Sequence, residues 1–242
     1  MGATPTPTPT ELELELDLGL DLNNLQPPTL SEYFSSNFDH IRELAIAQMQ
    51  LLVLVMAITA VTGISIGLLI WKRQTISEAI TNLFAAILTI PSLAMLTLMI
   101  GPFGLGWLPT VISLLLYAQL PVIRNTVVGM RSVDPAVLES ATAMGMGPMR
   151  VLFRIQFPLA WPVIIAGLRV SSMLIFGISA IAAYVGGPGF GDLMFSGLAS
   201  LGAFNSMNQT IIGALGITIL ALAFDAMFVI GRRVTTSRGI RV

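Results

Sequence analysis

Five long apolar segments constrain the fold of this chain more than any other feature of its sequence. A helix needs about 20 apolar residues to cross the roughly 30 Å hydrocarbon core of a bilayer, and each segment reaches that length. The whole chain is 55% hydrophobic and only 10% charged, which is too apolar for a soluble domain. We therefore predict an all-α, polytopic integral membrane protein with about five transmembrane helices, over residues 44–71, 75–100, 109–128, 162–184 and 207–230.

The second and third segments contain a helix-capping pattern and two prolines. A Thr75-x-x-Glu78 pattern predicts a capping box at the start of the second segment. Pro91 breaks that segment, and Pro121 lies inside the third. Because proline lacks a backbone N–H and clashes with the preceding turn, a helix that it breaks leaves backbone groups that protein or a water-lined cavity must satisfy.

Residues 1–30 differ in composition from the rest of the chain. They begin with a Thr-Pro repeat, continue as an alternation of acidic residues with leucine, and end near two consecutive prolines. The prolines favour an extended start, and an isolated strand of this length is only marginally stable. We expect a disordered tail over residues 1–30 to which no function is assigned, followed by one transmembrane domain over residues 31–242.

Charged residues are distributed so unevenly that they indicate a topology. Eight of the thirteen acidic residues lie in the first 43 positions, and eleven of the twelve basic residues follow Ile70. The basic residues flank alternate ends of the five segments, and such clusters remain on the cytoplasmic side of a membrane. We therefore expect a multi-pass protein of the plasma (inner) membrane with its N-terminus outside and its C-terminus in the cytoplasm.

The connection between the third and fourth segments, residues 131–161, is long and basic. Asp134 can cap a short helix over residues 135–144, in which proline occupies the first position. Gly145 then ends this helix. Beyond it, apolar residues at helical spacing predict a second short helix that ends at Pro158. The predicted arrangement is a helix, a glycine turn and a second helix.

This connection resembles the EAA loop of permease subunits of binding-protein-dependent ABC importers. Ser140 replaces the usual second alanine and Phe157 the usual leucine, and both departures leave the glycine turn intact. In that family the loop is cytoplasmic, and its first helix enters a cleft of the ATPase subunit. The resemblance therefore implies that the loop couples this chain to a separate ATPase through Glu139, Ser140, Ala141, Gly145, Ile155 and Pro158.

Further stretches resemble the osmoprotectant branch of these permeases, which imports quaternary amines such as glycine betaine, choline or carnitine. The resemblance covers roughly residues 44–233 and implies a substrate of that kind. Permeases for methionine share several of the same stretches, so an importer of an amino acid or another small solute is the alternative. The matching stretches are I-P-S-L-A at 90–94, L-P-V-I-R-N-T at 120–126, V-D-P at 133–135 and G-F-G-D-L at 189–193.

The resemblance implies a transport subunit rather than an enzyme, and no cofactor is expected. With one histidine and no acidic cluster outside the tail, the composition argues against a catalytic metal site. Nothing in the chain resembles the G-x-x-x-x-G-K-[ST] loop that binds nucleotides, so ATP hydrolysis falls to two copies of a separate ATP-binding subunit. Five helices are too few to enclose a passage, so each chain forms half of the pathway beside a second permease subunit, identical or homologous. An extracytoplasmic substrate-binding protein and the lipid bilayer complete the partners, and no nucleic acid is expected.

Two other classes of function fit the sequence less well. A channel or carrier that works without ATP favours charged residues at the bilayer midplane, where this chain has none. A membrane enzyme needs a nucleophile with a base or a metal cluster. The chain has no cysteine, and its one histidine, His40, precedes the first segment near the outer surface.

A few polar or irregular positions within and between the segments are candidate functional residues. Arg169 and Asp225 each lie one to two turns from a cytoplasmic end, and a charge inside a membrane is costly unless it is paired. They pair with each other or, alternatively, Arg169 extends toward the headgroups. The glycine-rich loop 186–192 predicts a tight bend, and residues 193–204 predict a short helix that lies at the outer surface or is partly re-entrant. The candidates that border the translocation pathway are Pro91, Ser92, Pro121 and Asn125.

Overall fold

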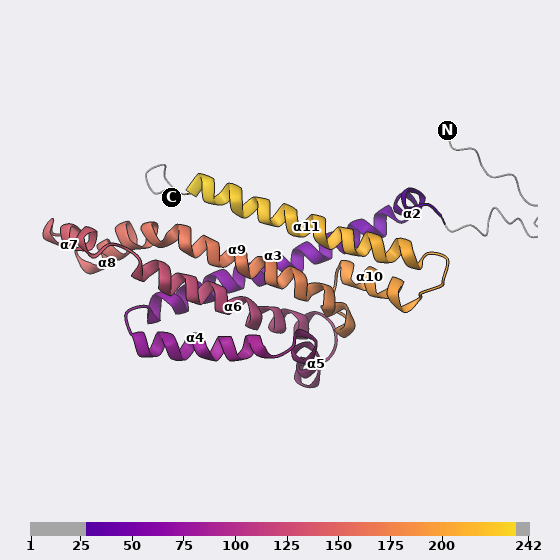
Figure 1. Ribbon diagram of the computed structural model, residues 1–242, viewed down its shortest axis with the longest axis horizontal. Helices are drawn as coiled ribbons and strands as arrows, with labels where there is room; N and C mark the ends of the chain where they lie inside the picture. The colour runs from indigo at the N-terminus through magenta and orange to yellow at the C-terminus, as the bar shows by residue number, and fades with distance from the viewer. Residues whose placement is uncertain (1–27, 236–242) are drawn as a thin grey trace, which may run out of the picture.

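The computed structural model describes residues 28–235, and within them every regular element is a helix (Figure 1). The predicted all-α fold is confirmed. The elements are α2 (Leu30–Ser36), α3 (Phe38–Ile70), α4 (Gln74–Thr89), α5 (Ser92–Phe103), α6 (Trp107–Arg131), α7 (Pro135–Ala143), α8 (Pro148–Val151), the π-helix η2 (Leu152–Gln156), α9 (Phe157–Ile181), the 3-10 helix η3 (Ala182–Val185), α10 (Phe190–Ala199) and α11 (Ser206–Thr235).

The long helices lie side by side along the long axis of the molecule (Figure 1). Helix α6 packs against α3, α4 and α9, and α11 packs against α9 and α10. Helices α7 and α8 lie at one end of the bundle, and α2, α5 and α10 lie toward the other. Among the described residues, four helical runs are long and apolar enough to span a membrane, and α4 and α5 make a fifth when the bent pair is counted as one span.

The first span begins earlier than its apolar segment suggests. Helix α3 starts at Phe38, so His40 lies in its first turn and not before the helix as predicted.

A short helix that the hydropathy pattern does not reveal, α2, precedes α3. Its capping box uses Thr29, whose Oγ1 accepts from the backbone N–H of Glu32 while its own N–H donates to the Glu32 carboxylate at 2.9 Å. The bond from the Thr29 N–H stabilises the charged carboxylate and so lowers the pKa of the Glu32 carboxyl group. Residues 1–27 of the predicted tail lie outside the described residues, and the boundary at residue 31 stays a prediction.

The second span is sharply bent. Helices α4 and α5 meet at 96° across Pro91, which confirms the predicted break. The predicted capping box at its start is wrong: α4 begins at Gln74, so Thr75 already lies inside the helix, and no side chain caps the first turn. Instead, the Gln74 amide Nε2 donates to the Glu78 carboxylate at 2.9 Å. Pro121, by contrast, lies within an unbroken α6.

The fourth span is continuous with the second short helix of the preceding loop. We expected that helix to end at Pro158 and a new one to begin near residue 162, but a single helical run covers Pro148–Val185. The π-helix accommodates the junction, because the N–H of Phe157 reaches back five residues to the carbonyl of Leu152. Such a widened turn inside a helix often lies at a functional site.

The core joins α3, α6, α9 and α11, and close helix contacts form where glycines allow them. A Cβ added at Gly67 of α3 would lie 2.5 Å from the Thr126 Cβ of α6, and one at Gly167 of α9 would lie 2.7 Å from the Pro121 carbonyl oxygen. Small residues permit this close approach of membrane helices. The main buried cluster consists of Leu51, Leu52, Val55, Met56, Leu114, Ala118, Val122, Leu168, Ile175, Phe176 and Phe224.

The glycine-rich loop before α10 forms the predicted tight bend. Gly186 and Gly189 have φ values of +74° and +125°, which side chains rarely tolerate. The chain then reverses into α10, which packs along the first part of α11 (Figure 1). A Cβ added at Gly197 of α10 would meet the Thr210 hydroxyl at 2.4 Å. The short helix predicted over 193–204 therefore exists, displaced by a few residues toward the N-terminus.

Candidate functional site

The loop between α6 and α9, defined here as the coupling loop (residues 131–161), is built from a capped helix and a glycine turn. The Asp134 carboxylate accepts from the backbone N–H of Ala136 at 2.9 Å, so it caps α7. At the other end Gly145 has φ +82°, and its N–H donates to the carbonyl of Thr142. The next N–H, of Met146, donates to Ala141 at 3.2 Å. This pattern satisfies the last carbonyls of α7 and reverses the chain.

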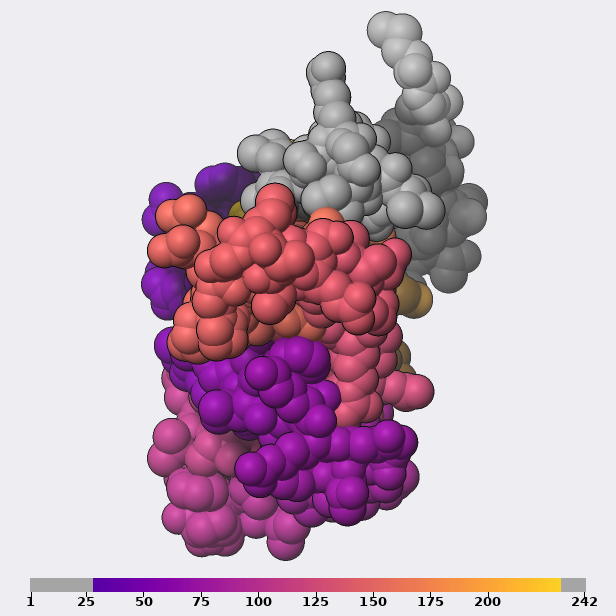
Figure 2. Space-filling model, turned by 90° about the vertical axis from the view of Figure 1, so that its left-hand side faces the viewer, coloured from indigo at the N-terminus to yellow at the C-terminus, as the bar shows by residue number. Residues whose placement is uncertain are grey.

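Helices α7 and α8 project from one end of the bundle. Figure 2 views that end, where the coupling loop (salmon) covers the surface beside the start of α4 (purple). The six motif residues differ in how exposed they are. Ala141 is buried against the protein, and Ile155 is half-buried. The side chains that face outward include Glu139 and Ser140, and Gly145 and Pro158 are exposed as well.

Exposed apolar side chains surround the outward face of α7. Val137, Met144 and Met149 are 41%, 75% and 65% exposed. Apolar patches rimmed by polar residues are typical of protein interaction sites. The coupling loop therefore presents an exposed apolar face on a helix whose backbone is fixed by its own cap and turn.

The two ends of the coupling loop are tied together by a glutamine that the sequence analysis did not single out. The buried Gln156 side chain lies on the π-helix, and its Nε2 donates to the Met130 carbonyl oxygen of α6 at 2.9 Å. Next to it, Arg131 donates through Nε to the Trp71 carbonyl and through Nη2 to the Ser77 hydroxyl, both at 2.8 Å. The signal that could have found Gln156 is a polar amide within an apolar helical stretch.

Arg169 and Asp225 are brought together across α9 and α11. The guanidinium donates two bonds to the carboxylate, one from Nε to Oδ1 and one from Nη2 to Oδ2, the latter at 2.7 Å. The two side chains are 41% and 21% exposed. A two-point contact of this kind fixes both the separation and the orientation of the helices that carry it.

The four pathway candidates fall into two separate places. At the α4–α5 bend, the carbonyl of Ile90, where α4 ends before Pro91, accepts from the hydroxyl of Tyr117 at 2.6 Å, and Ser92 begins α5. On α6, the Asn125 amide Nδ2 donates to the Pro121 carbonyl at 2.8 Å, on the side that packs against Gly167. The structure thus provides a protein partner for the broken backbone at Pro91, from a tyrosine that the sequence analysis missed.

A second buried glutamine anchors the bend at the opposite end of the bundle. Gln48 of α3 donates through Nε2 to the Ser179 hydroxyl at 2.6 Å and accepts from the backbone N–H of Phe190 at 3.2 Å. A Cβ at Gly189 would collide with this amide. Gln48 therefore holds α3, α9 and the start of α10 in one arrangement.

The chain matches known proteins over most of its length. The family described as "Binding-protein-dependent transport system inner membrane component" matches residues 45–235. The glycine betaine/carnitine/choline transport system permease protein OpuCD of Bacillus subtilis is 36% identical over 199 residues, which cover 81% of this chain and 84% of that protein. The osmoprotectant import permease protein OsmW of Salmonella typhimurium is 31% identical over 214 residues, covering 86% and 98%.

Solved structures share the fold. A chain of the MetNI methionine ABC transporter in an inward-facing conformation superposes with a TM-score of 0.70 at 17% identity, covering 81% of this chain and 96% of that one. The predicted extent of the resemblance, residues 44–233, agrees with the family match. The chain is a multi-pass inner membrane protein, and it belongs to the family of inner membrane components of binding-protein-dependent transport systems.

Proposed function

We propose that this chain forms half of the translocation pathway of an ATP-driven importer and transmits the work of a separate ATPase through the coupling loop. The observation that carries the proposal is the loop itself: a capped helix, a glycine turn at φ +82° and an exposed apolar face around Glu139. The family's description, a component of binding-protein-dependent transport, supports a receptor as a further partner.

The substrate that we propose is an osmoprotectant such as glycine betaine, choline or carnitine. The names of the relatives support it, since one is a glycine betaine/carnitine/choline permease and another an osmoprotectant import permease, and the matches cover 81% and 86% of the chain. An amino acid such as methionine is the second candidate, because a methionine transporter shares the fold. Fold similarity at 17% identity carries less weight for substrate than sequence similarity at 36%.

In the proposed topology the coupling loop and the C-terminus are cytoplasmic and the N-terminus is outside. The basic residues Lys72, Arg73, Arg131, Arg150 and Arg154 lie on the helices and loops near the α7 end of the bundle, which the positive-inside tendency assigns to the cytoplasm. The α7 end is then the side from which an ATPase reaches the loop.

The contacts of the loop indicate how motion passes into the membrane. ATP closes the ATPase pair and draws the two coupling loops together. Because Gln156 ties the π-helix to the end of α6, a displacement of α7 moves α6 and α9 as a unit. The Arg131 contacts carry the same displacement to the α3–α4 turn. The two permease halves then reopen toward the outside.

Uptake into proteoliposomes tests the proposal. The complex of this permease, its ATPase and its receptor is reconstituted with ATP inside, and uptake of labelled glycine betaine, choline, carnitine and methionine is compared. We expect uptake of at least one quaternary amine that requires both ATP and the receptor. Uptake of methionine alone would assign the second substrate class, and uptake without ATP would contradict the importer mechanism.

A further inference from the structure

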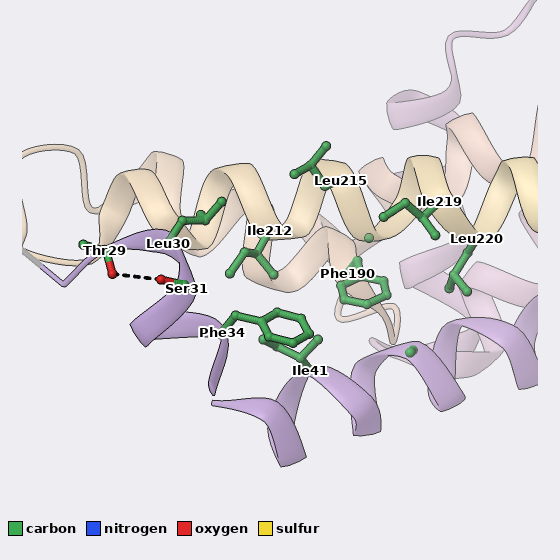
Figure 3. Close-up of a pocket in the computed structure, with 12 residues that line it drawn as sticks. Thr29, Leu30, Ser31, Phe34, Ile41, Phe190, Ile212, Leu215, Ile219 and Leu220 are labelled. Atoms are coloured by element: carbon green, nitrogen blue, oxygen red, sulfur yellow. Dashed lines mark hydrogen bonds between the residues drawn. The ribbon is translucent and has the colours of Figure 1, made fainter. Parts of the chain in front are cut away.

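An apolar groove of about 810 Å³ lies between α11 and the pair of α2 and α3 (Figure 3). Its walls come from Ile212 and Leu215 of α11 and from Ile41 of α3, and the Phe190 ring lies between them. The groove is separate from the coupling loop, which lies at the other end of the bundle. No residue of the proposed transport mechanism lines it.

The groove is polar at one end and apolar along the rest of its length. At the α2 end the hydroxyl groups of Thr29 and Ser31 lie 3.1 Å apart. Every other lining residue is aliphatic, aromatic or glycine. Figure 3 shows the hydroxyl pair at one end and Ile219 and Leu220 at the other. A ligand that fits has a polar end and a flexible apolar body.

The groove runs from the end of the bundle into the depth of the membrane. Ile212 and Leu220 are eight positions apart on α11, a rise of about 12 Å, and Leu220 packs against the main buried cluster. Helix α11 also buries the smallest share of its apolar window among the four unbent candidate spans. The groove therefore opens onto the exposed apolar face of a candidate membrane span, with its polar end toward the end of the bundle.

Other occupants fit this groove poorly. The segment that precedes Thr29 in the chain alternates leucine with Glu11, Glu13, Glu15 and Asp17, so inserting its leucines would carry carboxylates toward the hydrocarbon. Water is not held by an apolar wall. An empty groove would leave the lining side chains without dispersion contacts on one side.

We propose that the groove binds one acyl chain of a phospholipid from the leaflet on the α2 side, with the glycerol region beside Thr29 and Ser31. This is the outer leaflet in the proposed topology. The bound chain bridges α11 to the α2–α3 pair and fixes α2 against the bundle. The inference depends only on the protein's position in the membrane and not on its transport substrate.

Photolabelling in lipid nanodiscs tests this site. The importer complex is embedded in phosphatidylglycerol and phosphatidylethanolamine that contain a trace of phosphatidylglycerol with a diazirine near the end of one acyl chain. After illumination, mass spectrometry locates the label. We expect it to concentrate on residues 41–45 and 212–220, above its level on the exposed face of α4, which reports ordinary contact with bulk lipid.

A variant that fills the groove gives the matched comparison. Ala45→Phe places a ring in the groove, whereas Ala86→Phe places the same ring on the exposed face of α4. We expect Ala45→Phe to lower the label on residues 212–220 about threefold or more relative to α4, because the acyl chain loses its packing contacts, and Ala86→Phe to leave the ratio unchanged.

Three results would overturn the proposal. The first is equal labelling of α4 and α11 in the unmodified protein, which would mean that α11 makes only ordinary contact with bulk lipid. This measurement does not depend on any variant. A disulfide between two copies that carry Leu215→Cys would mean that a second permease subunit covers the groove. A rise in labelling after deletion of residues 1–27 would mean that the chain's own N-terminal segment occupies it.

Discussion

Gly145 allows the chain to reverse after α7, next to the surface that we assign to the ATPase. Its φ of +82° lies in the region that residues with a Cβ avoid, so the reversal after α7 depends on glycine. No atom outside its chain neighbours lies within 4 Å of a Cβ added there. The space around Gly145 is therefore open toward the face that we assign to the ATPase.

Gly145→Val should uncouple the transporter without unfolding it. The strained φ costs roughly 1–3 kcal/mol locally, and the valine side chain enters the open space where the partner lies. We expect normal membrane insertion but a joint loss of transport and receptor-stimulated ATP hydrolysis. The measurement is ATPase co-purification and hydrolysis beside Met149→Leu, an exposed control on the same loop. Normal transport by Gly145→Val with its ATPase bound would remove the role that we propose for this turn.

The pair of Arg169 and Asp225 should behave as a unit. Either single alanine variant leaves an unpaired charge within a membrane helix. We therefore expect Arg169→Ala and Asp225→Ala each to lower the thermal unfolding temperature of the purified protein. The exchange Arg169→Asp with Asp225→Arg should recover part of that loss, because the opposite charges still meet. If the exchanged protein is no more stable than the singles, the two side chains act independently.

At the scale of the helices, sequence patterns predicted which elements exist better than where they end. Hydropathy located the four unbent spans and the bent pair of α4 and α5, since lipid contact requires long apolar runs. It missed α2, which a capping box and not apolarity starts. It also missed residues 38–43 at the start of α3. At α4 the prediction was wrong in the other direction: the sequence shows a capping-box pattern, but Thr75 lies inside the helix and caps nothing.

Pro91 and Pro121 show that a proline's effect on a helix depends on tertiary contacts. At Pro91 the helix breaks, and the Tyr117 hydroxyl satisfies the carbonyl of Ile90. At Pro121 the helix continues between tightly packed neighbours, and Gly167 lets α9 approach its carbonyl. Nothing in the residues next to either proline distinguishes these cases. The same limit explains why Gln156 and its long-range bond were missed.

The bond from Gln156 should be essential to coupling. Gln156→Leu keeps the side chain's size but leaves the Met130 carbonyl without this donor, at a cost of about 1–3 kcal/mol. We expect the ratio of receptor-stimulated to basal ATP hydrolysis to fall several-fold, because the loop no longer moves α6 and α9 together. Gln50→Leu, at an exposed position of α3, is the matched control. An unchanged ratio together with lower thermal stability would limit Gln156 to a structural role.

At the scale of the whole molecule, the bundle has two chemically different ends. The α7 end carries the coupling loop and the basic residues around it, whereas the α2 end carries Glu32, Asp39 and the glycine bend (Figure 1). Basic residues resist translocation more than acidic ones. The charges and the position of the coupling loop were read from different residues, and both favour a cytoplasmic α7 end.

Labelling of single cysteines tests this orientation directly, because the protein has no cysteine of its own. Ser35 of α2 and Thr142 of α7 are both exposed and lie at opposite ends of the bundle. With a membrane-impermeant maleimide applied to intact spheroplasts, Ser35→Cys should react at once and Thr142→Cys only after permeabilisation. The two sites serve as controls for each other, since both become accessible in detergent. The reverse pattern would place the coupling loop outside, where no ATPase could reach it, and the proposed mechanism would fail with the topology.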